Sequence, residues 1–306
     1  MTTSSQTAAD GGDRLRSPAR MRSLRIGPLK LTYVPDGMVQ LSPRLWFAAS
    51  TEADWAAHPE YLDSDGYLVA SIGGLLVEQD GDSAGALLID AGFGPMTMPA
   101  QEGARLGAVR SGSLLDSLAA TGRPPAEIGA VALTHLHPDH VGWAWQAAPG
   151  GEGPALAGAE YLLAEQEWAG RRHAGAEGLG DDILAALAPR VRTVADGEEI
   201  RPGVRARLIP GHTSGHTAYV ISAGGQRVIA FGDALHSPVQ VAHPEWSAAP
   251  DLDRDAAAEA RRALVAELAE PGTIGFGIHF ADVPFGTVHR DGDGYRWVPY
   301  PEDATD

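Results

Sequence analysis

The sequence contains no cysteine and only one lysine, Lys30, among its 306 residues. Without a thiol the chain can form no disulfide, no thiolate metal site and no cysteine nucleophile, so any metal ion must bind to His, Asp or Glu. Basic residues are also outnumbered: 23 Lys and Arg stand against 40 Asp and Glu, which gives a formal net charge of −17. A field of that sign repels polyanions and argues against nucleic acid as a partner.

Long apolar segments are missing as well. There is no run of about 18 apolar residues to span a bilayer, and the first residues lack the apolar stretch of a secretory signal. We therefore expect a cytoplasmic protein with no membrane partner. Residues 1–25 are rich in Ser, Thr, Gly and Arg, which predicts a disordered tail. Residues 26–306 are predicted to form one domain, because a chain of this length can bury a single large core.

Short apolar runs bounded by Gly, Pro and Asp follow residue 26, and amphipathic stretches lie between the later runs. This alternation predicts a mixed α and β fold in which helices cover sheets. Strands are expected at 29–34, 68–78, 86–90, 130–134, 160–164, 204–210, 217–222, 227–231 and 273–278, and helices near 113–121, 165–173, 181–187 and 253–269. The last helix is the clearest, because Ala257, Ala260, Leu264 and Leu268 form one apolar stripe.

The stretch THLHPDH, residues 134–140, follows one of these apolar strands. His135 and His137 alternate along extended chain, so their side chains point the same way. Pro138 ends the strand, and Asp139 and His140 begin a predicted helix. Asp139 alone would be interpreted as a helix cap, and each histidine alone as an ordinary polar residue. The four together indicate a metal site with nitrogen and carboxylate ligands, which suits Zn²⁺, with Mn²⁺, Fe²⁺ or Co²⁺ as alternatives.

Further ligands are available downstream. PGHTSGHT, residues 210–217, supplies His212 and His216, but its Pro and Gly residues favour a turn over a helix, so only one of the two is expected to reach the metal. FGD at 231–233 ends a strand on Asp233, whose carboxylate could bridge two ions. GIH at 277–279 places His279 at the end of another strand.

These pieces, together with LIDAGFG at 88–94, resemble the metallo-β-lactamase fold superfamily in their order and spacing. The resemblance implies an α/β fold, the αββα four-layer sandwich, with two metals at one edge of the paired sheets. It also implies a role for each site residue. His135, His137 and His212 would hold the first metal, Asp139, His140 and His279 the second, and Asp233 would bridge them. His216 would lie behind the ligands, and Asp90 would brace a ligand imidazole.

The C-terminal half is most similar to the branch that includes methyl parathion hydrolase and lactonase-like enzymes, on the segments GDALHSPVQ (232–240), HPEW (243–246), DLDRDAAAEARRALVAELA (251–269) and GYRWVP (294–299). This similarity implies a dinuclear zinc-dependent hydrolase of a small ester or lactone. Two cations about 3.5–4 Å apart would lower the pKa of a shared water, so that hydroxide attacks the carbonyl. Asp139 would carry the proton to the leaving oxygen. His236, where lactonases carry a tyrosine, would bind the oxyanion. Trp143 and Trp168 are predicted to line the substrate pocket, with packing in the core as an equal alternative for Trp168.

Several alternatives stay open at this stage. An organophosphate triesterase or a biosynthetic thioesterase or cyclase would use the same site, whereas a mononuclear iron dioxygenase is less compatible with a full ligand set. Uncharged esters or lactones are expected to be preferred over β-lactams, because Lys30 is remote in sequence and Arg171 and Arg172 lie on a predicted helix. The partner is therefore a small-molecule substrate. A homodimer is compatible with the sequence, which leaves the oligomeric state open.

Overall fold

The structure, a computed structural model, describes residues 13–79, 81, 85–172 and 179–301. Within these residues one sheet contains nine strands, in the order β5-β6-β2-β3-β4-β7-β8-β9, with β1 paired to β2 outside that path. Its strands are β1 Arg22–Ile26, β2 Leu29–Leu41, β3 Leu68–Gln79, β4 Ala86–Ile89, β5 Met96–Met98, β6 Leu106–Ser111, β7 Ile128–Ala132, β8 Glu160–Ala164 and β9 Val191–Val194.

The second sheet runs in chain order from β10 to β16. Its strands are β10 Glu199–Arg201, β11 Val204–Leu208, β12 Thr217–Ala223, β13 Gln226–Ala230, β14 Thr273–Phe276, β15 Phe285–Asp291 and β16 Gly294–Pro299. The helices are α2 Pro43–Trp46, α3 Glu52–Ala57, α4 Leu114–Ala120, α5 Pro138–Trp145, α6 Glu165–Ala169, α7 Asp181–Leu187, α8 Val239–Ala242 and α9 Arg254–Leu268. Short 3-10 turns lie at Pro59–Tyr61, Pro125–Glu127, Ala188–Arg190 and Gly232–Ala234.

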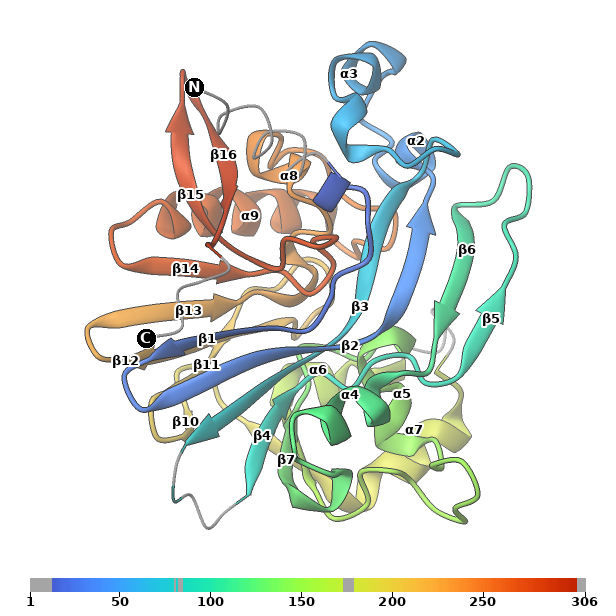
Figure 1. Cartoon of the computed structure of the whole chain (residues 1–306), viewed down its shortest axis with the longest axis vertical. Coiled ribbons are helices and arrows are strands. Elements are labelled where there is room, and N and C mark those ends of the chain that lie inside the picture. Colours follow the sequence, from blue (N-terminus) through green and yellow to red (C-terminus); the bar gives the residue numbers. More distant parts are fainter. Residues whose placement is uncertain (1–12, 80, 82–84, 173–178, 302–306) are drawn as a thin grey trace, which may run out of the picture.

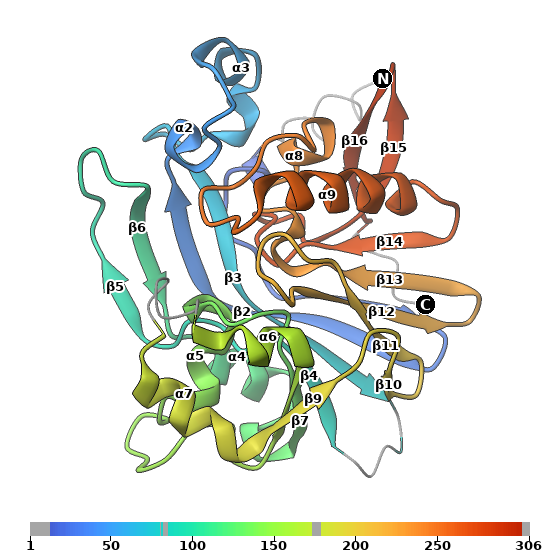
Figure 2. The same ribbon diagram turned by 180° about the vertical axis from the view of Figure 1, so that it is seen from behind.

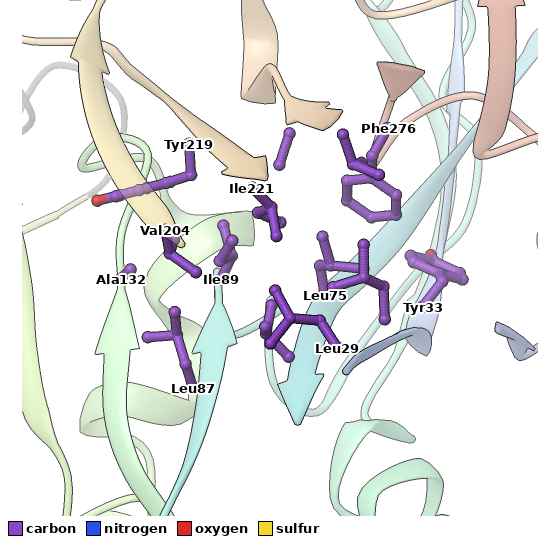
Figure 3. Packing of buried hydrophobic residues seen from close by; sticks show 14 of the residues in the cluster. Leu29, Tyr33, Leu75, Leu87, Ile89, Ala132, Val204, Tyr219, Ile221 and Phe276 are labelled. Carbon is purple, nitrogen blue, oxygen red and sulfur yellow. The ribbon is translucent and has the colours of Figure 1, made fainter. Parts of the chain in front are cut away.

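The two sheets pack face to face and helices cover their outer faces (Figure 1). Figure 3 shows the inner core, where side chains of the first sheet such as Leu29, Leu75 and Ile89 meet Ile221 and Phe276 of the second. Helices α4, α5 and α7 bury their apolar faces on the first sheet, and α9 does so on the second (Figure 2). The layers therefore run helix, sheet, sheet, helix, which confirms the predicted αββα sandwich.

Helix α9 follows its sequence closely. Asp253 caps it by accepting a hydrogen bond from the amide of Ala256 at 3.0 Å, which satisfies one of the free amides at the first turn. Leu264 and Leu268 of the predicted stripe are buried against the second sheet. The helix expected over 165–173 is shorter, because α6 ends at Ala169 before a glycine.

The fold starts earlier than expected. β1 begins at Arg22, inside the segment interpreted as a tail, and Ala19 is buried with its amide bonded to Ser71 Oγ at 2.7 Å. The composition of the segment is misleading here because two of its arginines, Arg14 and Arg22, bind Asp282 instead of pointing into solvent. Residues 1–12 of the predicted tail lie outside the described residues.

The structure also adds strands to those expected: β5, β6, β9, β10, β15 and β16. Most are short, and β16 mixes polar and apolar residues with no clear period, so a search for apolar runs passes over them. In the described part of the chain we find no helix with the length and apolar character needed to cross a bilayer.

Candidate metal centre

All the predicted ligands come from segments that follow strands at one edge of the sandwich. The loop after β7 carries His135 and His137, and α5 begins directly behind it. His212 lies between β11 and β12, Asp233 follows β13, and His279 follows β14. Because β4 pairs parallel to β7 and β13 parallel to β14, the ends of these strands reach the same edge of each sheet.

The structure brings the seven residues together in two groups. His135, His137, His212 and Asp233 form one group, and Asp139, His140 and His279 form the other, with ligand atoms within 4.8 Å of one another in each.

Asp233 reaches both groups. Its Oδ1 lies 3.1 Å from His140 Nε2 and 3.0 Å from His279 Nε2, and its Oδ2 lies 3.3 Å from His212 Nε2. One carboxylate is thus shared by the two groups, which is the arrangement that a bridging ligand requires.

The buried atoms of the cluster fit a cation. His135 Nε2 and Asp233 Oδ1 are buried, and neither has a hydrogen-bond partner in the described structure. His212 Nε2 and His137 Nδ1 also converge to 3.1 Å. Unpaired buried polar atoms are costly unless another group satisfies them. A divalent ion that accepts these lone pairs removes the cost, and the nitrogen and oxygen donors suit zinc.

The electrostatics point the same way. Burial, and then the neighbouring imidazoles, hold the pKa of His135 and His137 well below the usual range, so both rings are neutral and offer lone pairs. For His212, burial acts in the same direction, but the carboxylates of Asp233 and Asp251 outweigh it and raise the pKa to about 9. Burial also opposes ionisation of Asp233, yet the surrounding imidazoles keep its pKa well below the usual range. Asp233 therefore carries a negative charge among the ligands, and the raised pKa of His212 shows that this site favours a positive charge beside it.

Each group has ligand imidazoles held from behind. His140 Nδ1 lies 2.9 Å from Asp90, which also accepts the amide of Thr134 at 2.8 Å. His279 Nδ1 donates to the carbonyl of Ser71 at 2.7 Å. Such contacts fix the orientation and tautomer of metal-binding imidazoles. The structure thus places Asp90 where the sequence predicted a brace.

A second carboxylate, Asp251, supports a ligand imidazole and was not predicted from the sequence. Asp251 Oδ1 lies 2.8 Å from His212 Nδ1, and its Oδ2 accepts a hydrogen bond from Arg261 at 2.9 Å. Both side chains of this ion pair are fully buried. Asp251 begins the segment 251–269 that resembles the lactonase-like branch, but an acidic residue just before a predicted helix is usually a helix cap, so its contact with a ligand was not predicted.

Glu167 is a second residue near the ligands that was not predicted. It is buried and accepts the amides of Leu136 at 2.9 Å and Gly215 at 3.0 Å, together with the hydroxyl of Thr213 at 2.6 Å. It therefore ties the loop of His135 to the loop of His212. Its helix, α6, was predicted, but an acidic residue there is normally solvated.

His216 and His236 both lie against Asp233. His216 Nε2 accepts the amide of Asp233 at 3.0 Å, behind the ligands as predicted. His236 Nε2 lies 3.1 Å from Asp233 Oδ2, and the ring meets Trp46 edge-on at 5.3 Å between centroids. Neither ring nitrogen of His236 has a hydrogen-bond partner in the described structure. His236 is thus buried beside the ligand groups, with Nε2 facing Asp233 and Nδ1 without a partner among the described residues.

A cavity of about 200 Å³ opens onto the ligands. Asp139, Asp233 and His236 line its inner end, and the remaining wall is mainly aliphatic and aromatic. The wall residues are Val39, Leu41, Trp46, Ala70, Ile72, Phe93, Leu106 and Val109, with Arg105 beside Trp46. The wall is therefore built by β2, β3, β6 and α2, far in sequence from the histidines.

The predicted pocket tryptophans are wrong. Trp143 is buried in the core under the first sheet and donates its Nε1 hydrogen to Asp36 at 2.9 Å. Trp168 packs at the edge of the same core, 4.7 Å from the Arg171 guanidinium. Trp143 follows the THLHPDH ligands in sequence, but helix α5 directs its side chain into the core. Trp46 lines the cavity instead. Arg105, rather than Lys30, Arg171 or Arg172, is the basic residue that lines the cavity, so the absence of a nearby cation does not hold as a reason to expect uncharged substrates.

Comparisons with known proteins agree with this fold. A family model described as the metallo-beta-lactamase superfamily matches residues 75–277. AidC, described as a dizinc quorum-quenching lactonase with the product N-hexanoyl-L-homoserine, is 23% identical with a TM-score of 0.76, over 94% of this chain and 99% of its own.

Two further solved structures show the same fold. The hydrolase AbOPH of the beta-lactamase superfamily is 25% identical with a TM-score of 0.72, over 94% of this chain and 99% of its own. AiiA from B. thuringiensis, with N-decanoyl-L-homoserine bound, is 19% identical with a TM-score of 0.63, over 84% and 94%.

Proposed function

The chain belongs to the metallo-beta-lactamase superfamily. From this premise we propose that it is a metal-dependent hydrolase that opens the ester bond of a lactone, or of a comparably small ester, at a two-cation centre. One observation carries the proposal. Asp233 is shared by two groups of ligands at the inner end of an apolar cavity. A dinuclear centre and a place for an apolar substrate therefore lie side by side.

The ligand assignment follows the two groups. His135, His137 and His212 would hold one zinc ion, Asp139, His140 and His279 the other, and Asp233 would contact both. Cations bound there supply two things, a water of lowered pKa and a polarised carbonyl. The remaining chemistry falls to side chains of the chain itself.

Asp139 is suited to move the proton. Its carboxylate lines the cavity, and its Oδ2 lies 3.7 Å from His279 Nε2 and 3.8 Å from His140 Nε2. Its side chain is 23% exposed, whereas the bridging Asp233 is 5% exposed. Asp139 can therefore accept a proton from the attacking water and return it to the leaving alkoxide.

His236 is suited to bind the developing oxyanion. Its ring lines the cavity, Nε2 lies 3.1 Å from Asp233 Oδ2, and Nδ1 lacks a hydrogen-bond partner in the described structure. An N–H aimed at the substrate carbonyl stabilises the charge that forms on the oxygen as the tetrahedral intermediate develops. Trp46 packs against the ring and holds it in place.

The apolar wall suggests what the substrate carries. Leu41, Ile72 and Val109 offer no hydrogen-bonding side chains, so an acyl chain fits the cavity better than a polar substituent. Two of the similar structures, AidC and AiiA, hold acyl homoserine products. We therefore place lactones with an apolar acyl chain first among the candidate substrates.

Metal analysis together with a substrate panel tests the proposal. The purified protein, its metal-stripped form and the form reloaded with zinc are assayed on acyl homoserine lactones of graded chain length, simple γ-lactones, aryl esters, thioesters, a phosphotriester and a penicillin. We expect two metals per chain, loss of turnover on stripping, recovery on reloading, and the highest kcat/KM for an acylated lactone. Full activity without metal would refute the centre. A phosphotriester turned over at least tenfold better than every lactone would refute the substrate class.

A further inference from the structure

An N-terminal segment is bound to the loop that follows His279. We call residues 14–22 the N-terminal clamp. The Arg14 guanidinium donates to the carbonyl of Asp282 at 2.8 and 3.1 Å, and the Asp282 amide donates to the carbonyl of Arg14 at 3.0 Å. The Asp282 carboxylate accepts the amide of Arg20 at 2.9 Å and Nε of Arg22 at 3.0 Å. Asp282 is thus held on both its backbone and its side chain.

A second link joins the clamp to His279 through β3. The amide of Ala19 donates to Ser71 Oγ at 2.7 Å, and Ser71 Oγ donates to the carbonyl of Ala281 at 3.0 Å. The carbonyl of the same Ser71 accepts the hydrogen of His279 Nδ1 at 2.7 Å. One buried serine therefore contacts the clamp, the loop and the ligand imidazole.

The loop needs such support because its backbone is strained. Ala281 has a φ of 43°, in the left-handed region that an alanine enters at a cost of about 1–2 kcal/mol. Its amide closes a tight turn onto the carbonyl of His279 at 2.8 Å. A strained turn persists only where its surroundings hold it in place. Here the clamp contacts Ser71, which bonds to Ala281, and Asp282, which follows Ala281 in the chain.

We propose that the N-terminal clamp is a positioning device for His279 and selectively sets how tightly the cation held by Asp139, His140 and His279 is bound. The inference rests on the proposed two-cation centre. Selectivity is expected because the other group is braced elsewhere: Asp251 supports His212, and Glu167 ties the two histidine loops together. No hydrogen bond of the described structure joins the clamp to either of these braces.

The test removes the clamp side chains and counts metals. Arg14→Ala/Arg22→Ala deletes the guanidinium contacts with Asp282. Arg16→Ala is the matched control, because in the described structure its guanidinium bonds to Asp13, the residue before the clamp, and not to Asp282. Zinc-loaded proteins are equilibrated with increasing concentrations of a chelator, and the zinc that remains per chain is measured. Contacts behind metal ligands typically change affinity about 10–100-fold. We expect the double variant to lose one zinc at a chelator concentration at least about tenfold lower than the wild type. The other zinc and the control should be unchanged.

Ser71→Ala keeps the test decisive if the double variant fails to fold. It retains the backbone carbonyl that His279 uses and removes only the hydroxyl that connects Ala19 to Ala281. Thermal unfolding of the metal-free proteins separates selective metal loss from general destabilisation. The clamp is refuted if both variants hold two zinc ions as firmly as the wild type, or lose both in parallel. A wild type that binds fewer than two zinc ions refutes the proposed centre instead.

Discussion

The buried ion pair behind His212 offers the sharpest test of how the candidate centre is built. Asp251 faces His212 with one oxygen and Arg261 of α9 with the other. Arg261 also donates hydrogen bonds to the carbonyls of Ala234 and Pro244. These carbonyls carry no charge, so the buried positive charge of Arg261 is balanced by Asp251. Asp251→Asn keeps the shape of the side chain and removes the charge.

Two effects should follow from Asp251→Asn, and their sizes come from different contacts. Arg261 would stay buried without its counter-charge, and breaking a fully buried pair in this way costs about 3–5 kcal/mol of unfolding free energy. His212 would lose the carboxylate that orients its ring, which should weaken zinc binding about 10–100-fold. Stability and metal affinity are thus expected to fall together in this variant.

A second substitution separates the two effects. Asp251→Asn/Arg261→Met removes both buried charges, so most of the lost stability should return, with a coupling of about 1 kcal/mol or more between the sites. Zinc affinity should stay low, because His212 still lacks its carboxylate. Arg262→Ala is the control on the same helix, where the exposed side chain should change stability by about 0.5 kcal/mol at most.

Urea unfolding of the metal-free proteins and chelator competition of the zinc-loaded proteins measure the two quantities. If the unfolding free energy of Asp251→Asn is within about 1 kcal/mol of the wild-type value, the ion pair is not buried as described. A double variant that regains wild-type zinc affinity would mean that the carboxylate does not support His212. Either result would overturn the reasoning.

Other changes give separate tests. Asp233→Asn should lower zinc content and turnover together, since an amide is a poor bridge between two cations; two zinc ions retained per chain would contradict this. His236→Phe should keep both metals and reduce kcat by about a hundredfold or more; unchanged turnover on the best substrate would return His236 to a packing role. Glu167→Gln should raise the zinc requirement for half-maximal activity, because one of the loop amides would lose its charged acceptor; an unaltered zinc titration would argue against the tie. Asp36→Asn should lower the unfolding free energy by about 3 kcal/mol or more, because the Asp36 carboxylate accepts hydrogen bonds from four backbone amides and the Trp143 indole. Urea unfolding measures this loss, and a value below about 1 kcal/mol would contradict the prediction.

Much of the centre could be predicted from sequence because its residues stand where strands end. The chemistry of a metal site needs nitrogen and carboxylate donors, and a chain without cysteine has few ways to supply them. His135 and His137 are two residues apart on extended chain, so one local rule already places them together. The order of the ligand motifs then identified the superfamily, and with it the αββα layers.

The surroundings of the ligands were decided by the tertiary structure alone. Trp46 and Arg105 enter the cavity wall from segments that precede all of the ligands in sequence. Asp251 meets His212 because the segment before α9 is hydrogen-bonded to the His212 loop through the amides of Leu252 and Asp253. The clamp looked like a tail because nothing local to it shows that Asp282 will accept its arginines. Ligand identity depends on residue type and short spacing, which the sequence displays. Pocket shape and bracing depend on contacts between residues up to 268 positions apart, and only the packed chain brings these together.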